Sequence, residues 1–344
     1  MVTEQQLRDR LRAVEDPELG VDIVSLGLVT NVRIDHETDL AVVSLAFNAP
    51  LSPAEWSMCD EVRALCRGVG LEPRIHADTA GDRGRFSGIK NSIAIGSAEP
   101  GAGVSLVTAN LAMALASIGA RVGVLDVRLE SSRDTWLDVI DPPDLSADRI
   151  VPRTVRGISV VRLGPVVPSC ATPPGSDVVL ELTVPTVVES MEWGPIDYLL
   201  VALPRGVDRN SAVVLEQVPT DGTIAVSSVD SSSAPTRSLV EDLTALGSTV
   251  IGVLETAEGE ETDGSGVERD WQPTELGPPH LGIVPLDRST LAMPGEPRTG
   301  PAPETSRWTS TAAMDESPFR DLALSITDRI GAVNRQCVTE RQLP

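Results

Sequence analysis

The sequence predicts an α/β protein in which a mostly parallel sheet flanked by helices follows a small α+β domain. Strand-like and helix-like segments alternate from about residue 89 to residue 336, and such alternation predicts parallel strands joined by right-handed crossovers. Residues 1–78 instead follow the order helix, strand, strand, helix, strand. The polar, glycine-bearing stretch at 79–88 is expected to be a linker between the two domains.

The small domain is predicted to begin with a helix whose start is marked by a capping box, Thr3 with Gln6. Asp16-Pro17-Glu18 is interpreted as the helix-to-strand turn that ends it. Ser52-Pro53-Ala54-Glu55 predicts a second capping box with proline at the first helical position, and this helix is expected to reach about Arg67. Strands are expected over Val29–Ile34, Ala41–Phe47 and Pro73–Ala77.

The larger domain is expected to open with a short buried strand, Ser92-Ile93-Ala94-Ile95. The helix that follows has an apolar face made by Val107, Leu111, Leu115 and Ile118. Further along, a Pro-rich, irregular region at 141–177 surrounds one strand, Ile158–Leu163. An acidic, Gly-rich loop is expected at 256–279, and a linker rich in Pro, Ser and Thr at 295–316.

A terminal helix is predicted to begin at Ser317-Pro318. Its apolar stripe consists of Phe319, Leu322, Ile326, Ile330 and Val333. Such a stripe favours docking against the core of the larger domain, and a partner surface is the alternative.

The turn between the first strand and helix of the larger domain reads Ser-Ala-Glu-Pro-Gly-Ala-Gly-Val-Ser over residues 97–105. Strand, glycine-bearing turn and helix form the context of a P-loop, in which backbone N–H groups surround phosphates and a lysine neutralises them. The position of that lysine holds Val104. The turn therefore predicts the shape of a phosphate-binding loop without its positive charge. A glycine-containing turn unrelated to phosphate is the alternative interpretation.

The larger domain resembles the Mrp/ApbC group of iron–sulfur cluster carriers, within the MinD/ParA class of P-loop ATPases. The loop of that class, GKGGVGKST, falls on residues 98–106 of this chain. Glu99 and Val104 stand in place of its two lysines. Three of its residues are kept, namely Gly101, Gly103 and the magnesium-binding hydroxyl, Ser105.

The resemblance continues along the following strands. Val122–Asp126 is similar to the second strand of the family and its "LLDAD" ending, with Arg128 in place of the final Asp. Asp197–Gly206 resembles the Walker B strand, "DYLIIDLPPG", with Ala202 in place of the Asp that lies beside the metal. Two further segments of this chain, Val250–Glu255 and Leu281–Asp287, resemble the last two strands of the family. The family holds its cluster with a CxxC pair between them, and this chain has no cysteine there.

The resemblance implies a vestigial nucleotide site made by Gly101, Gly103, Ser105 and Asp126. A hydrogen bond between a lysine and a phosphate contributes about 1.5–3 kcal/mol, and Val104 cannot supply one. Glu99 adds negative charge near the phosphates or near the nucleotide of a partner subunit. Ala202 weakens the hold on Mg²⁺ and on the attacking water. We therefore expect no catalytic residues and poor or absent ATP hydrolysis.

The first domain resembles the MIP18-type domain, also called DUF59. The resemblance rests on Asp16-Pro17-Glu18-Leu19 and on Asp22–Val29, which reads DIVSLGLV. Many proteins that fuse this domain to an Mrp core take part in iron–sulfur assembly, and they often carry a Cys-Pro dipeptide before the second helix. This chain has Ser52-Pro53 there.

Composition limits the partners of this chain. Its 344 residues include 50 acidic and 28 basic side chains, so the formal net charge is −22, and Lys90 is the only lysine. Such a charge repels nucleic acid and anionic membranes, and neither is expected to bind. No run of 18 apolar residues and no N-terminal signal is found, which favours a cytoplasmic protein. Acidity with almost no lysine is typical of halophilic proteins, and a GC-rich genome that prefers Arg codons is the alternative.

Cysteines and histidines are too scattered to predict a metal site within one chain. Cys59 and Cys66 share a face of one helix but lie about 10 Å apart along its axis, so core packing is expected for both. The remaining candidates are Cys170, Cys337, His36, His76 and His280.

Three functions stay open at this point. The first is a pseudo-ATPase that acts as a scaffold or regulator in iron–sulfur assembly. The second is an active ATP-binding cluster carrier like the rest of the family, and the third is a nucleotide-binding module that does not hydrolyse. ATP with Mg²⁺ is expected to bind weakly at most, and an iron–sulfur cluster is not expected on this chain alone. Expected partners are a second copy, an intact Mrp-like paralogue or the iron–sulfur assembly machinery.

Overall fold

The computed structural model describes residues 2–77, 88–99, 101–128, 149–163, 190–204, 209–257, 277–286 and 318–342, together with residues 181, 184, 185, 187 and 188. The chain forms two compact units. The first comprises Met1–Asp82 and Leu324–Pro344, and the second comprises Arg83–Ala323. Each unit has an apolar core of its own.

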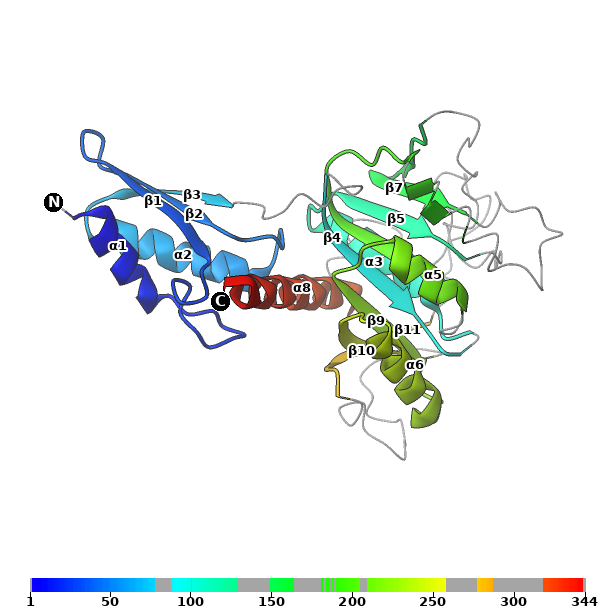
Figure 1. The fold of residues 1–344 in the computed structure, drawn as a ribbon. Helices are drawn as coiled ribbons and strands as arrows, with labels where there is room; N and C mark the ends of the chain where they lie inside the picture. The colour runs from blue at the N-terminus through cyan, green and yellow to red at the C-terminus, as the bar shows by residue number, and fades with distance from the viewer. Residues whose placement is uncertain are drawn as a thin grey trace, which may run out of the picture. The chain divides into compact units, whose positions relative to one another are not determined.

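In the first unit, two helices cover one face of a three-stranded sheet (Figure 1). The strand order is β1-β2-β3, with β1 and β2 antiparallel and β2 and β3 parallel. The elements are α1 (Glu4–Arg10), a 3-10 turn (Leu11–Ala13), β1 (Val29–Asp35), β2 (Leu40–Leu45), α2 (Pro53–Gly68) and β3 (Glu72–Ala77). The predicted order of elements is confirmed.

The two predicted capping boxes differ in the structure. At α1 both halves are present, because Gln6 N–H donates to Thr3 Oγ1 at 3.2 Å and Thr3 N–H donates to Gln6 Oε1 at 3.0 Å. At α2 only Ser52 follows the pattern, its hydroxyl accepting from Glu55 N–H at 3.2 Å. The Glu55 carboxylate instead accepts from Ala49 N–H at 3.3 Å. Only one of the two hydrogen bonds of the second capping box is therefore present, because the buried carboxylate of Glu55 binds Ala49 instead of the backbone of Ser52.

The core of the first unit lies between its helices and its sheet. Leu7 from α1, Leu45 from β2 and Met58 from α2 are fully buried in it. Cys66 is buried in the same cluster and Cys59 packs against it, so both cysteines of α2 pack in the core as predicted.

The second unit is built on an eight-stranded sheet in the part of the chain that the structure describes. Its order is β11-β10-β9-β4-β8-β5-β7-β6, and every neighbouring pair is parallel except β6 with β7. The strands are β4 (Ile89–Gly96), β5 (Val122–Asp126), β6 (Arg153–Val155), β7 (Ile158–Arg162), β8 (Ile196–Ala202), β9 (Gly222–Ser228), β10 (Val250–Ala257) and β11 (His280–Pro285). The predicted α/β class is thus confirmed.

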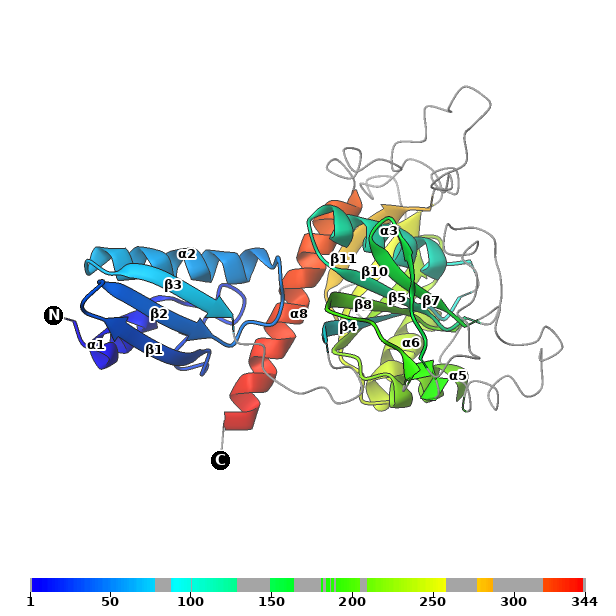
Figure 2. The ribbon, with the colours of Figure 1, turned by 90° about the horizontal axis from the view of Figure 1, so that it is seen from above.

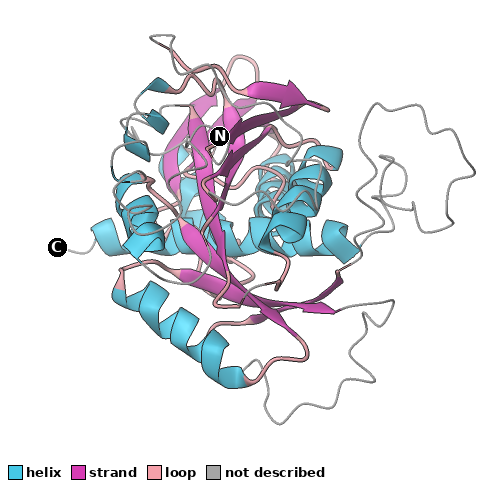
Figure 3. Ribbon diagram, turned by 90° about the vertical axis from the view of Figure 1, so that its right-hand side faces the viewer, coloured by secondary structure: helices cyan, strands magenta, loops and turns pink. Residues whose placement is uncertain are grey.

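Helices flank both faces of this sheet (Figures 2 and 3). The helices are α3 (Val104–Ser117), α5 (Arg209–Gln217) and α6 (Ser233–Ala245). Figure 2 shows α3 on one side and α5 and α6 on the other. Strands covered on both faces read as continuous apolar runs, and all seven residues of β8 are buried. The carboxyl ends of these strands meet at one edge, next to the start of α3.

The last helix, α8 (Pro318–Gln342), begins in the second unit and continues in the first from Leu324 onward. Four residues of its predicted stripe are buried, and Val333 is half-buried. We expected the second domain to span residues 89–336, and the structure differs at this end. The reason is polar, because Asp328 and Arg335 of α8 bind partners in the first unit.

Several predicted segments lie outside the described residues. They are most of the linker at 79–88, the Pro-rich region apart from the strand inside it, most of the acidic loop at 256–279 and the linker at 295–316. None of the helices that the structure describes combines the length and apolar character needed to cross a lipid bilayer.

Candidate functional site

The turn between β4 and α3 has the backbone shape of a phosphate-binding loop. β4 ends at Gly96, α3 begins at Val104, and Gly101 and Gly103 have φ angles of 85° and 83°. Glycine adopts these left-handed conformations without strain. Gly103 is also tightly packed, since a Cβ built there would lie 2.4 Å from Cδ1 of Leu286. Both glycines predicted from sequence therefore have a structural reason to be glycine.

Side chains from distant strand ends hold this turn in place. The Thr256 hydroxyl, at the end of β10, lies 3.0 Å from the Ala102 carbonyl oxygen and can donate to it. The Glu99 carboxylate accepts from the Ser231 hydroxyl, and Glu99 N–H donates to Ser97 Oγ at 3.1 Å. Sequence reasoning missed Thr256 and Ser231, which are 154 and 132 residues from their partners. The available signal was their position, because Thr256 lies at the end of β10 and Ser231 lies just after the neighbouring strand β9.

Asp126 and Ala202 lie side by side below the turn. Asp126 ends β5 and pairs in register with Ala202 of β8 and with Arg162 of β7. Ala202 in turn pairs with Ile95 of β4, the strand that leads into the turn. Asp126 is thus placed where the resemblance predicts it, whereas Ala202 offers only a methyl group at the position expected for a second carboxylate.

Arg128 joins Asp126 to the first turn of α3. Its guanidinium donates to both carboxylate oxygens of Asp126, with Nε 2.8 Å from Oδ1 and Nη2 2.7 Å from Oδ2. Its third nitrogen, Nη1, donates to the hydroxyl of Ser105. The sequence marked Arg128 only as the loss of an acidic residue, and the structure makes it the central cation of the site.

A second arginine adds to this charge. Nε of Arg162 lies 3.6 Å from Oδ2 of Asp126. The side chains of Asp126 and Arg162 are 1% and 2% exposed, and that of Arg128 is 11% exposed. Two guanidinium groups, one buried and one partly exposed, therefore share one buried carboxylate, and the three side chains together have one more positive than negative charge. We call Ser105, Asp126, Arg128 and Arg162 the Asp126 cluster.

The residues of this cluster do not fit a magnesium ion. Mg²⁺ requires oxygen ligands in near-octahedral geometry. The two candidate ligands, the Ser105 hydroxyl and the Asp126 carboxylate, both accept hydrogen bonds from Arg128. Ala202 has no oxygen in its side chain. The guanidinium occupies the space between hydroxyl and carboxylate that a bound metal would need.

The only lysine of the chain is placed far from the turn. Lys90 lies at the start of β4, and six residues of strand, about 20 Å, separate it from Gly96. Its ammonium pairs with Asp197 at 3.1 Å, and Arg121 also donates to that carboxylate. Burial raises the pKa of Asp197, but the hydrogen bonds from Arg121 and Lys90 outweigh it and lower the pKa to about 2. Lys90 therefore belongs to a structural ion pair at the opposite edge of the sheet.

The remaining predicted positions are also placed. Val104 is the first residue of α3 and is half-buried, with no charged atom to offer. Glu99 points its carboxylate to Ser231. The structure places Gly101, Gly103, Ser105 and Asp126 at or beside the turn, and their role as a nucleotide site stays a prediction.

Two of the three described cysteines, Cys59 and Cys66, are poor candidates for holding a cluster, and the third, Cys337, is exposed. Burial raises the pKa of Cys59 to about 11, and burial also raises the pKa of Cys66. A raised pKa disfavours the thiolate, which is the form that binds metals. Within the described ranges, no three His, Cys, Asp or Glu side chains form a potential metal site. Cys170 lies outside those ranges.

Two family models match this chain. The family described as NUBPL iron-transfer P-loop NTPase matches residues 88–269, which is more than half of the sequence. The family described as iron–sulfur cluster assembly protein matches residues 4–66. The two matches fall on the second and first unit, respectively.

Individual relatives agree with these matches. The iron–sulfur cluster carrier protein of Synechocystis sp. is 27% identical over 315 residues, covering 83% of this chain and 88% of that protein. The chloroplastic Fe-S cluster assembly factor HCF101 of Arabidopsis thaliana is 24% identical, covering 99% of this chain and 65% of that protein. Among solved structures, the cell division ATPase MinD of Pyrococcus furiosus is 20% identical, with a TM-score of 0.46 over 69% of this chain and 98% of that one.

Proposed function

The chain belongs to the NUBPL iron-transfer P-loop NTPase family, with an N-terminal iron–sulfur assembly domain, and we propose that it is a member that does not hydrolyse ATP. In this proposal it acts in iron–sulfur cluster assembly or carriage as a scaffold or regulator. The observation that carries the proposal is Arg128, which binds the Ser105 hydroxyl and the Asp126 carboxylate with one guanidinium.

The chemistry of phosphoryl transfer supports this proposal. Catalysis of that reaction depends almost entirely on positioning and on neutralising charge with lysine and Mg²⁺. Val104 supplies no ammonium, and Ala202 supplies no carboxylate to orient a metal or a water. Arg128 satisfies the two remaining polar groups, so the metal has neither ligands nor room.

Nucleotide binding without turnover is the second candidate, and one observation favours it. The turn keeps its left-handed glycines, so the backbone N–H groups at the start of α3 remain available to an anion. The Asp126 cluster has one more guanidinium than carboxylate. Both features attract phosphate, whereas Glu99 and a net charge of −22 oppose it.

Two measurements on the full-length protein in molar KCl distinguish the candidates. Isothermal titration with Mg-ATP measures binding, and a phosphate-release assay measures turnover. We expect phosphate release no faster than in the blank. Binding without release supports the nucleotide-binding module, and neither binding nor release supports the scaffold. Release at many times the blank rate would overturn the proposal and restore the active carrier.

A matched variant shows whether the substituted residues are the cause. Val104→Lys, Ala202→Asp and Arg128→Asp together return the three positions to the residues that the resemblance implies. We expect this triple variant to bind Mg-ATP more tightly than the original chain does. Equal binding would mean that charge at these three positions does not limit affinity.

We further propose that the chain pairs with an intact paralogue. The resemblance implies dimers in which a loop lysine reaches the nucleotide of the other subunit, and Glu99 stands at that position. Glu99 would spoil that contact at both nucleotides of a homodimer, whereas a paralogue with both lysines would still bring one of them to the nucleotide of this chain. Co-purification from the native host should recover that paralogue, and recovery of the homodimer alone would contradict the pairing.

A further inference from the structure

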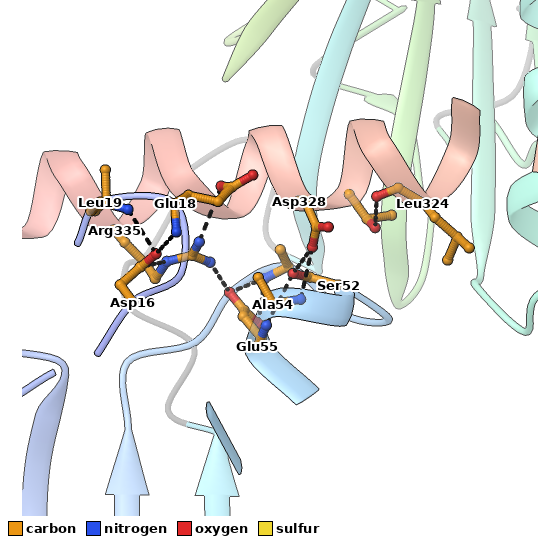
Figure 4. Close-up of polar contacts among 11 residues, drawn as sticks. Asp16, Glu18, Leu19, Ser52, Ala54, Glu55, Leu324, Asp328 and Arg335 are labelled. Carbon is orange, nitrogen blue, oxygen red and sulfur yellow. Dashed lines mark hydrogen bonds and ion pairs between the residues drawn. The ribbon is translucent and has the colours of Figure 1, made fainter. Parts of the chain in front are cut away.

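Arg335, on the part of α8 that belongs to the first unit, is a buried guanidinium among carboxyl groups (Figure 4). Its side chain is 1% exposed, and Nε contacts Oδ2 of Asp16. Nη1 lies 3.2 Å from Oε1 of Glu55, and Nη2 lies 3.4 Å from Oε2 of Glu18. One cation therefore faces three carboxyl groups, and we call these four residues the Arg335 cluster.

A second polar contact lies two helical turns earlier on the same face of α8. The Asp328 carboxylate accepts from the Ser52 hydroxyl at 2.6 Å and from Ala54 N–H at 3.0 Å (Figure 4). Ala54 is in the first turn of α2, where N–H groups have no partner within the helix. α8 therefore supplies the start of α2 with an acceptor, and Asp328 and Arg335 form a pair seven residues apart.

Gly331 lies between these two residues and permits a close approach. A Cβ built on Gly331 would lie 2.6 Å from Nη1 of Arg335 and 3.1 Å from Cβ of Ala49. The helix backbone thus lies almost against the segment before α2. Asp328, Gly331 and Arg335 recur at spacings of three and four residues, which places all three on one face of the helix.

In the part of the chain that the structure describes, the main apolar cluster of the first unit is formed without α8. The core cluster and the side chains packed against it run from Val2 to Ile75, and no residue of α8 belongs to them. Ile326 and Ile330 of α8 are buried but lie outside that cluster. The contacts described above that join α8 to the first unit are charged. Buried ion pairs specify register and partner more than they add net stability.

The covered surface includes Asp16, which lies in one of the two segments that carry the resemblance of the first domain, and Ser52, which precedes Pro53 where many proteins of that kind have a Cys-Pro dipeptide. Asp16 is 0% exposed and also forms the turn that was predicted, accepting from Glu18 N–H at 2.9 Å. Ser52 is likewise 0% exposed. The turn interpretation of Asp16-Pro17-Glu18 is thus confirmed, and the structure adds a second role as the acceptor of an arginine.

We propose that this face of the first unit is a helix-docking site and that α8 is its detachable occupant. The site recognises a helix that carries a carboxylate and, seven residues later, a guanidinium on one face. While α8 is bound, the face is closed. When α8 leaves, Arg335 leaves with it, and the carboxyl groups of Asp16, Glu18 and Glu55 stay on the face, where they fit a partner helix with the same pair. This inference is independent of the nucleotide site.

Hydrogen exchange of the full chain, read by mass spectrometry, tests the detachment. Arg335→Met should raise exchange about tenfold or more in α8 beyond Leu324 and in residues 49–56. The backbone amides of β1 and β2 should keep their protection. Arg329→Met, which removes an exposed arginine from the same helix, is the matched control and should change neither. Equal deprotection of the strands, or no change at all, would overturn the proposal.

A competing peptide tests the docking site. A labelled peptide of residues 318–342 should bind the full-length Arg335→Met protein and bind the original chain about tenfold more weakly, because the original α8 occupies the face. The same peptide with Arg335→Met should fail to bind either protein. Absence of peptide binding to the Arg335→Met protein would show that the face accepts α8 only as a fixed part of the fold, and would refute the proposal.

Discussion

The Arg335 cluster of the first unit and the Asp126 cluster of the second have opposite charge. In the first, one buried arginine faces three carboxyl groups. In the second, one buried carboxylate is shared by two arginines. Among the residues of these clusters, carboxyl groups outnumber arginines in the first and arginines outnumber carboxylates in the second.

The two clusters also differ in how they are assembled. Asp126 and Arg162 are neighbours in register on adjacent strands, and Arg128 follows two residues after Asp126. Arg335 instead reaches Asp16 across 319 positions of sequence. Asp126 and Arg162 cannot be separated without unfolding the sheet, although the side chain of Arg128 can turn. A cluster closed by a separate helix can be opened by moving that helix.

The largest expected effect is the loss of Arg335. Arg335→Ala leaves three carboxyl groups buried around an empty space, and removing one partner of a buried ion pair costs about 3–5 kcal/mol. We expect the free energy that keeps α8 docked on the first unit to fall by about 3–5 kcal/mol, measured from the hydrogen exchange of α8 beyond Leu324, while β1 and β2 keep their protection. Arg329→Ala should change it by less than about 0.5 kcal/mol. A small effect of Arg335→Ala would show that water reaches the carboxyl groups of Asp16, Glu18 and Glu55 in the variant.

The corresponding change in the second unit is Asp126→Ala, which leaves two guanidinium groups without their carboxylate. We expect the unfolding free energy of the second unit to fall by about 3 kcal/mol, the lower end of the same range, because Arg128 is partly exposed. Sulfate should stabilise this variant more than it stabilises the original chain, because an anion can replace the carboxylate. Equal stabilisation of both proteins by sulfate would contradict the excess positive charge.

The pH dependence of the first unit should depend on Glu55. Burial raises its pKa from 4.5 to about 7, although Arg335 and the N–H groups of Ala49 and Asn48 act to lower it. A carboxyl group with a raised pKa stabilises the fold below its unfolded pKa and loses that contribution as the pH rises through the folded value. The first unit should therefore lose about 3 kcal/mol between about pH 4 and pH 8.

Glu55→Gln tests the origin of that loss. The amide does not titrate, so the decline in unfolding free energy above pH 4 should flatten. Glu18, whose pKa is also raised by burial, leaves a smaller slope of the same sign. Thermal unfolding at a series of pH values measures both. An unchanged slope in Glu55→Gln would assign the pH dependence to other groups.

The smallest expected effect concerns the turn between β4 and α3. Thr256→Val removes the hydroxyl that lies within hydrogen-bonding distance of the Ala102 carbonyl and should cost about 1 kcal/mol. Ser231→Ala, which removes the bond to Glu99, should cost no more. Hydrogen exchange of the amides at the start of α3 checks both variants. Unchanged protection in Thr256→Val would mean that Leu286 packing alone holds the turn.

Much of this fold could be predicted because its signals are local. Alternating apolar strands, the glycines of the turn and the caps at Thr3 and Ser52 each depend on residues a few positions apart. The site was predicted in part for the same reason. Gly101, Gly103 and Ser105 lie in one short segment, and Asp126 ends a recognisable strand.

The rest depends on pairings that sequence spacing does not encode. Arg128 was interpreted as a lost carboxylate, and its bond to Ser105 requires β5 to end beside the start of α3. The polar face of α8 was overlooked because its apolar stripe was the stronger pattern, so the helix was assigned wholly to the larger domain. Glu55 has the residue type and the position of a capping-box residue. Its carboxylate nevertheless turns to Arg335, a contact that the local sequence does not reveal.

The most direct test of the central claim is a crystal structure of the full chain grown with Mg²⁺ and ADP at saturating concentrations. We expect the Arg128 guanidinium to remain between Asp126 and Ser105, with no metal ion bound to the Ser105 hydroxyl. An octahedral magnesium ion on Ser105, with Arg128 turned away from Asp126, would contradict the account.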